Sequence, residues 1–154
     1  MNKSSNISNT SFNLAGITTY QSGVAQASAF RVIKRHTAHA LRDYNLSCMQ
    51  WFTIGTALDA GTKGVRISDL AKQLDTTLAY MTINLLESRG ILNKKAHKFD
   101  ARTKLVTVKP TYKKTCIEIE AVLRSKLRDM LHKNINAEEL ANYVKVLYKI
   151  SALG

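Results

Sequence analysis

The chain has 154 residues, 45% of them hydrophobic, which is enough for one domain with its own core. Seven glycines and one proline exclude a collagen-like chain, two cysteines are too few for a disulfide scaffold, and no run of 18 apolar residues predicts a membrane span. Lys and Arg number 23 against 11 Asp and Glu, and this net charge of +12 indicates a polyanionic partner, most often nucleic acid. No signal-peptide pattern is seen at the N-terminus, so we expect a cytoplasmic protein.

The N-terminal third is predicted to hold a tail and two helices. Residues 1–16 are rich in Ser, Asn and Thr, and we expect a flexible tail there, followed by a single domain over residues 17–154. Apolar residues at steps of three and four predict a helix over residues 20–43. Ser47 and Gln50 form a capping-box pattern that begins a second helix, and Gly61 and Gly64 end it.

A helix-turn-helix is predicted over residues 65–90. Val65 and Ile67 flank Arg66 as a very short strand, and Ser68 is placed to cap a short helix. Residues 75–77 form a turn, and a second helix runs from about residue 78 to 88, where Gly90 stops it. Two short helices joined by a tight turn are typical of this arrangement.

A hairpin and two helices complete the chain. Residues 91–92 and 105–108 predict two antiparallel strands joined by an exposed basic loop. Pro110 suits the first position of a long helix, and Asn136 with Glu139 begins the last one. The predicted fold is mainly α with a small β-hairpin wing: a winged helix-turn-helix lobe over about 46–109, bracketed by terminal helices at about 18–44 and 110–152.

Four segments, in the right order and at the right spacing, resemble the MarR family of bacterial transcription regulators. They are Leu46-Ser47-Cys48-Met49-Gln50-Trp51, Ile67-Ser68-Asp69-Leu70-Ala71, Leu86-Glu87-Ser88-Arg89-Gly90-Ile91-Leu92 and Asp100-Ala101-Arg102. The chain departs from the family's pattern at Met81 and Leu85, where many relatives carry Arg, and at the strand-to-helix junction, residues 108–112.

The resemblance implies a homodimer whose terminal helices interlock and whose two lobes bind double-stranded DNA. Many relatives are repressors that leave DNA when a small aromatic or anionic compound binds. We expect the dimer to form through the first, fifth and sixth helices, with apolar residues buried at Leu140, Tyr143, Val144 and Leu147.

The wing is the strongest local signal for DNA contact. Nine basic residues and one acidic residue lie between positions 89 and 114, and they supply +8 of the net charge. Arg102 is the best candidate for a narrow minor groove, and Asp100 is placed to hold its guanidinium. Lys95, Lys98 and Lys104 are further phosphate candidates. The alternative is a solvated turn with a surface ion pair of little energy.

The helix from residue 78 is predicted to bury Ala79, Ile83 and Leu86, with Thr82 beside them. The DNA-facing candidates are Thr76, Thr77, Leu78, Tyr80, Met81 and Asn84. Among these, Thr77, Tyr80 and Asn84 are the best base-edge candidates, because they are polar and lie outside the buried stripe. Asn can pair with adenine, and Thr or Leu can touch a thymine methyl. Thr76 and Thr77 alternatively bind phosphate. Core or interface packing is the alternative for Met81 and Leu85.

Other candidate sites are weaker. His36 and His39 have a metal-compatible spacing, but a solvated basic face is favoured and no metal or other cofactor is expected. Buried packing is likewise favoured over redox sensing for Cys48 and Cys116. Phe30, Tyr44 and Trp51 are weak candidates for an effector cleft, with core packing as the alternative.

The predicted function is that of a sequence-specific, ligand-responsive repressor, and no catalytic constellation suggests an enzyme. Two alternatives stay open. One is a winged-helix protein-interaction module or antirepressor that has lost specific DNA binding, which Met81 and Leu85 motivate. The other is nonspecific coating of nucleic acid by a basic protein.

Overall fold

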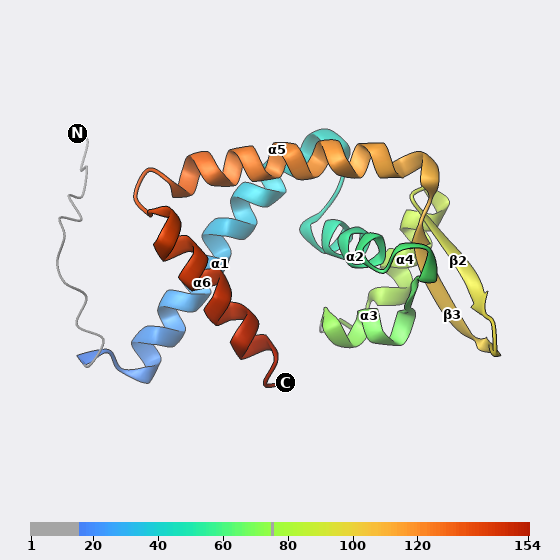
Figure 1. Ribbon diagram of the computed structural model, residues 1–154, viewed down its shortest axis with the longest axis horizontal. Coiled ribbons are helices and arrows are strands. Elements are labelled where there is room, and N and C mark those ends of the chain that lie inside the picture. The colour runs from blue at the N-terminus through green and yellow to red at the C-terminus, as the bar shows by residue number, and fades with distance from the viewer. Residues whose placement is uncertain (1–15, 75) are drawn as a thin grey trace. The chain divides into compact units, whose positions relative to one another are not determined.

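The computed structural model describes residues 16–74 and 76–154. The elements labelled in Figure 1 are α1 (Thr19–Leu41), α2 (Cys48–Asp59), β1 (Val65–Arg66), α3 (Ile67–Gln73), α4 (Ala79–Ser88), β2 (Leu92–His97), β3 (Asp100–Val108), α5 (Lys113–Leu131) and α6 (Ala137–Ser151). This order confirms the predicted winged helix-turn-helix with helices before and after it. The chain divides into two compact units within α1, after Ile33. Most of the predicted tail, residues 1–15, lies outside the described residues.

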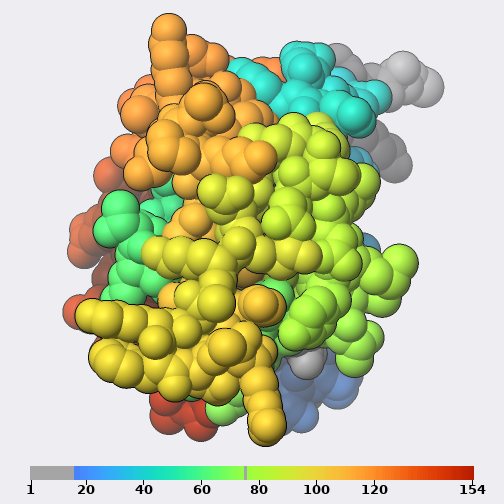
Figure 2. Space-filling model, turned by 90° about the vertical axis from the view of Figure 1, so that its right-hand side faces the viewer, coloured from blue at the N-terminus to red at the C-terminus, as the bar shows by residue number. Residues whose placement is uncertain are grey.

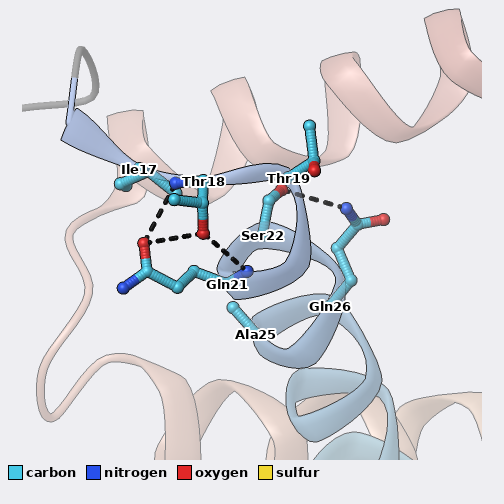
Figure 3. A pocket seen from close by; sticks show the side chains of 7 residues that line it. All are labelled: Ile17, Thr18, Thr19, Gln21, Ser22, Ala25 and Gln26. Carbon is cyan, nitrogen blue, oxygen red and sulfur yellow. Dashed lines mark hydrogen bonds between the residues drawn. The ribbon is translucent and has the colours of Figure 1, made fainter.

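The first unit contains the start of α1, shown in Figure 3. Thr18 and Gln21 cap the helix reciprocally: the Thr18 N–H donates to Gln21 Oε1 at 3.0 Å, and the Gln21 N–H donates to Thr18 Oγ1 at 3.3 Å. Tyr20, Val24 and Phe30 are more than half exposed on this helix. The first unit by itself therefore leaves large apolar side chains in water.

In the second unit, the capping box predicted at the start of α2 is confirmed. The Gln50 N–H donates to Ser47 Oγ at 3.1 Å, and the Ser47 N–H donates to Gln50 Oε1 at 2.9 Å. The helix ends at Asp59, and Gly61 and Gly64 follow with positive φ angles of 58° and 77°. At Gly64 a Cβ would lie 3.0 Å from the carbonyl oxygen of Val106, so the close approach of β3 also requires glycine.

The predicted cap of the next helix is wrong. Helix α3 begins at Ile67 rather than after Ser68, and the residue before it, Arg66, makes no side-chain cap. Arg66 pairs with Leu105 across β1 and β3, and Ile67 is 3% exposed. The chain therefore passes directly from a paired strand into a helix whose first residue is held by burial, without a polar cap.

The sheet has the order β1-β3-β2, with both pairs antiparallel. The exposed basic loop predicted between the two wing strands is wrong in extent, because β2 and β3 run through the basic segment and leave only Lys98 and Phe99 between them. Ladder hydrogen bonds come from the backbone, so charged residues can lengthen a hairpin beyond the core. Figure 1 shows this hairpin, called the wing below, beside α4.

The core of the second unit lies where α2, α3, α4 and α5 meet the base of the wing. The predicted stripe of Ala79, Ile83 and Leu86 is confirmed, since none of the three is more than 4% exposed. Leu92, Val106, Val108, Cys116, Ile119 and Leu123 pack in the same cluster. Thus α4 is anchored along one face, and the opposite face is left for other contacts.

Of the two C-terminal helices, α6 begins as predicted, whereas α5 begins at Lys113, three residues after the predicted Pro110. Pro110 opens a single 3-10 turn that leads into α5, and Asn136 with Glu139 forms a capping box at the start of α6. In contrast to the lobe helices, α6 has no buried residue. Across residues 16–74 and 76–154, none of the helices combines the length and apolar character needed to span a membrane.

Candidate nucleic-acid interface

The outward face of α4 is well exposed and mostly apolar. Leu78, Tyr80, Met81 and Leu85 are 57%, 60%, 69% and 47% exposed. Successive helix residues rotate by about 100°, so Met81 lies nearly opposite the buried Ile83. The structure therefore shows that Met81 and Leu85 do not pack in the core of this chain.

The turn before α4 uses one of its two threonines internally. Thr76 Oγ1 accepts a hydrogen bond from the backbone N–H of Leu78 at 3.1 Å and so closes the turn. Thr77 is exposed. Of the two threonines predicted to contact phosphate, Thr77 thus has the more available side chain.

Asn84 on α4 is tied to the wing. Its Oδ1 accepts a hydrogen bond from Lys94 Nζ at 2.7 Å, and the same ammonium lies 2.9 Å from Glu87 Oε2. Lys94 on β2 therefore bridges two residues of α4 that lie one turn apart. This contact joins the helix to the wing and engages the oxygen that Asn84 would use toward adenine.

The tip of the wing is ordered by Asp100. The Arg102 N–H donates to Asp100 Oδ1 at 3.0 Å, and the Thr103 hydroxyl donates to Asp100 Oδ2 at 2.7 Å. The Thr103 hydroxyl and then the Arg102 N–H hold the pKa of Asp100 below its usual value. The prediction that Asp100 holds the Arg102 guanidinium is therefore wrong: the carboxylate holds the backbone, which is nearer in a tight turn.

The basic side chains of the wing differ in whether they already contact other groups of the protein. Lys95 Nζ donates to the Thr62 carbonyl oxygen, so this ammonium is engaged on the lobe. Arg102 and Lys104 are exposed, and neither side chain has an ion-pair partner in the described part of the chain. Lys98 lies over the ring of Phe99, with Nζ 5.5 Å from its centroid. Of the wing cations predicted to contact phosphate, Arg102 and Lys104 are thus the most available.

One face of the second unit gathers these groups. Figure 2 looks onto the wing and shows the yellow-green atoms of α4 beside the yellow and orange atoms of the hairpin. The Lys94–Asn84 hydrogen bond confirms that the two are neighbours. A projecting helix and a basic hairpin therefore form one continuous surface, which we call the α4–wing surface.

Two residues of this surface are not identified by reasoning from the sequence. Lys94 is one of nine basic residues between positions 89 and 114, and spacing alone does not reveal its partners on α4. Phe99 is the second: it is 85% exposed at the wing tip, and its ring centroid lies 6.0 Å from that of His97. An aromatic residue inside a run of charges is the signal that could have found it.

A separate cavity of about 730 Å³ lies among α2, α5 and α6. Trp51, predicted as a weak effector candidate, lines it together with Phe52 and Tyr148. The wall also carries Asp59, Glu120 and Arg124, and the last two form an ion pair at 3.2 Å. Tyr44 instead packs against the core, and Phe30 lies in the first unit. The structure brings only one of the three candidates to this cavity.

The surroundings of Cys48, Cys116 and His39 favour neither redox sensing nor metal binding. Cys48 and Cys116 are buried free thiols, and burial raises the pKa of each above its usual value. At Cys48, burial raises the pKa by more than the nearby Lys34 and a backbone hydrogen bond lower it. Nδ1 of His39 contacts the Arg42 guanidinium, a cation that opposes a metal ion there. The described residues contain no group of three potential metal ligands.

No protein-family model and no curated protein matches this sequence. Solved structures do match. A MarR-family transcriptional regulator from Rhodococcus sp. RHA1 has a TM-score of 0.80 and 14% identity, covering 88% of this chain and 96% of that one. The MarR-family regulator Sco3205 from Streptomyces coelicolor, solved in complex with DNA, has a TM-score of 0.74 and 13% identity, with 88% of each chain covered.

A third solved structure is BpsR from Bordetella bronchiseptica, whose DNA binding is regulated by 6-hydroxynicotinic acid. Its TM-score is 0.73 at 20% identity, covering 85% of this chain and 98% of that one. At such identities the likeness establishes the fold. The chain thus has the winged helix-turn-helix fold of MarR-family regulators.

Proposed function

We propose that this protein is a MarR-type transcription regulator that binds a specific double-stranded DNA sequence as a homodimer. The observation that carries the proposal is the α4–wing surface, where an exposed helix adjoins a hairpin that carries the exposed cations Arg102 and Lys104. A helix of this size fits the major groove, and cations on a hairpin reach phosphates along the adjoining minor groove. The same fold in Sco3205, which was solved with DNA, supports the assignment.

The homodimer is supported by the apolar surface of the terminal helices. Tyr143, Val144 and Leu147 on α6 are each more than 40% exposed, and Val146 and Ile150 are more than half exposed. A helix with so much apolar surface and no buried residue of its own needs a partner. A second copy of the chain is the partner we propose, with Leu140 at the same interface.

Repression relieved by an effector is the regulatory mode we propose. The cavity among α2, α5 and α6 offers aromatic walls from Trp51, Phe52 and Tyr148. Its charged wall residues are one cation, Arg124, and two carboxylates, Asp59 and Glu120. This balance suits an uncharged or cationic aromatic compound better than an anion. Regulation of BpsR by an aromatic acid shows that this fold can carry such control.

The test is selection of bound sequences from random duplex DNA, followed by affinity measurements over a range of salt concentrations. We expect an inverted repeat with half-sites about 34 Å apart, bound at least a thousandfold more tightly than random duplex. A ratio near one would instead support nonspecific coating of nucleic acid. Absence of duplex binding at moderate salt would support the protein-interaction module, for which the apolar α4 face is the favouring observation.

A further inference from the structure

The outward face of α4 carries no unpaired formal charge. Its exposed side chains are Leu78, Tyr80, Met81, Asn84, Leu85 and Ser88. The only ionisable acid or base within α4 besides Tyr80 is Glu87, which is paired with Lys94 at 2.9 Å. The outward face of α4 therefore contributes no cation of its own to the attraction of DNA phosphates.

The apolar residues of this face form one continuous stripe. Leu78 precedes Met81 by three positions and Leu85 follows it by four, which is the spacing of neighbours along one side of a helix. Met81, at 69% exposed, stands at the middle and points away from the core. The stripe therefore occupies the part of α4 that would enter a groove most deeply.

The polar groups beside the stripe are largely engaged within the protein. Asn84 Oδ1 accepts from Lys94 Nζ, and the Ser88 hydroxyl donates to the Leu85 carbonyl oxygen at 2.7 Å. Guanine is usually read by Arg or Lys, which donate to its O6 and N7, and α4 offers neither outward. The Tyr80 hydroxyl and the Asn84 amide nitrogen are the hydrogen-bonding groups that this face still offers, and neither is a cation.

The major groove contains one apolar group, the C5-methyl of thymine. We propose that Leu78, Met81 and Leu85 read thymine methyls, so the base pairs facing α4 in each half-site are mainly A·T. The inference rests on the proposed function and specifies the ligand chemistry of the same surface. The adjoining cations Arg102 and Lys104 favour DNA as the occupant of this apolar face, because a protein partner would have little need of them.

The experiment replaces thymine with uracil, one position at a time, in the duplex selected by the full-length protein. Uracil keeps every hydrogen-bonding group and removes only the methyl. Removal of one buried methyl is expected to weaken binding about fourfold. Methylation of cytosine at C5 offers the converse test, since it adds the same methyl to a G·C pair.

Substitutions in the protein identify which residue contacts the thymine methyl. With Met81→Ala, the thymine and uracil duplexes should bind equally at the position that Met81 contacts, whereas Met81→Leu should keep most of the preference. Met49→Ala is the matched control, because it makes the same change at another exposed methionine, 36% exposed on α2 and outside the α4–wing surface. Circular dichroism confirms that each variant is folded.

The outcomes separate the two proposals. Sequence-specific binding that is insensitive to uracil everywhere, or half-sites rich in G·C opposite α4, would overturn thymine reading and leave the proposed function standing. Failure to bind duplex DNA with any sequence preference would overturn both. A uracil effect that persists unchanged in Met81→Ala, Leu78→Ala and Leu85→Ala would also overturn the inference.

Discussion

At the scale of single residues, the surroundings of Arg102 suit the DNA contact that we propose for it. Its backbone is held by the Asp100 carboxylate, while its guanidinium has no ion-pair partner in the described part of the chain. A charge whose backbone is fixed loses less conformational freedom when it binds. Lys95 on the same hairpin is the contrasting case, since its ammonium already contacts the Thr62 carbonyl.

We predict that Arg102→Ala weakens binding to specific and random duplexes alike. Removing one phosphate-binding cation should reduce the slope of log affinity against log salt concentration by about 0.9. Fluorescence anisotropy at several salt concentrations measures both quantities. Lys95→Ala serves as the comparison within the wing and should change the slope less. An unchanged affinity and slope in Arg102→Ala would show that Arg102 does not contact the DNA.

At the scale of elements, polar caps and burial are alternative ways to begin a helix. Helix α2 begins with the reciprocal Ser47–Gln50 box, and α6 with the corresponding Asn136–Glu139 box. Helix α3 begins without one, because strand pairing at Arg66 and burial of Ile67 hold its first turn. Two serines near helix starts therefore have different structural roles.

This difference gives a matched pair of substitutions. Ser47→Ala removes a cap and should lower the free energy of unfolding by about 0.5–2 kcal/mol. Ser68→Ala makes the same chemical change at an exposed position that does not cap a helix. It should alter the free energy of unfolding by less than about 0.5 kcal/mol. Urea unfolding followed by circular dichroism measures both. Equal losses of stability in the two variants would contradict the assignment of the caps.

At the scale of the whole molecule, unburied apolar surface is the main feature that calls for a partner. It occurs on both terminal helices, at Tyr20 and Val24 in α1 and at Val144 and Leu147 in α6. An obligate homodimer typically buries more than about 2,000 Å² of such surface. Dimerisation would also supply the two lobes that an inverted-repeat operator requires.

We therefore predict that sedimentation equilibrium at micromolar concentration gives twice the mass of one chain. Leu147→Glu should shift the protein toward monomer, because a carboxylate at an apolar interface loses its hydration. Lys149→Glu is the control: it also adds a carboxylate to α6, two positions away and so on a different side of the helix. A wild-type protein that is folded and monomeric would contradict the dimer.

Local features of the sequence determined much of this fold. Apolar spacing located the helices and the buried stripe of α4, and the side-chain chemistry of Ser47–Gln50 and Asn136–Glu139 determined two helix starts. These features depend on residues within one or two turns of each other, so their physical causes are visible in the chain itself. The basic character of the wing is equally local, since it follows from composition between positions 89 and 114.

Contacts between distant residues were decided only by the tertiary structure. The register of β1 on β3 determines where α3 begins, and the pairing of β2 with β3 extends the wing through its charges. The same packing brings Lys94 to Asn84 and directs Asp100 to a backbone N–H, and it leaves the Arg102 guanidinium without an ion pair among residues 16–74 and 76–154. Spacing along a chain cannot specify these partners, because each depends on how separate elements meet in space.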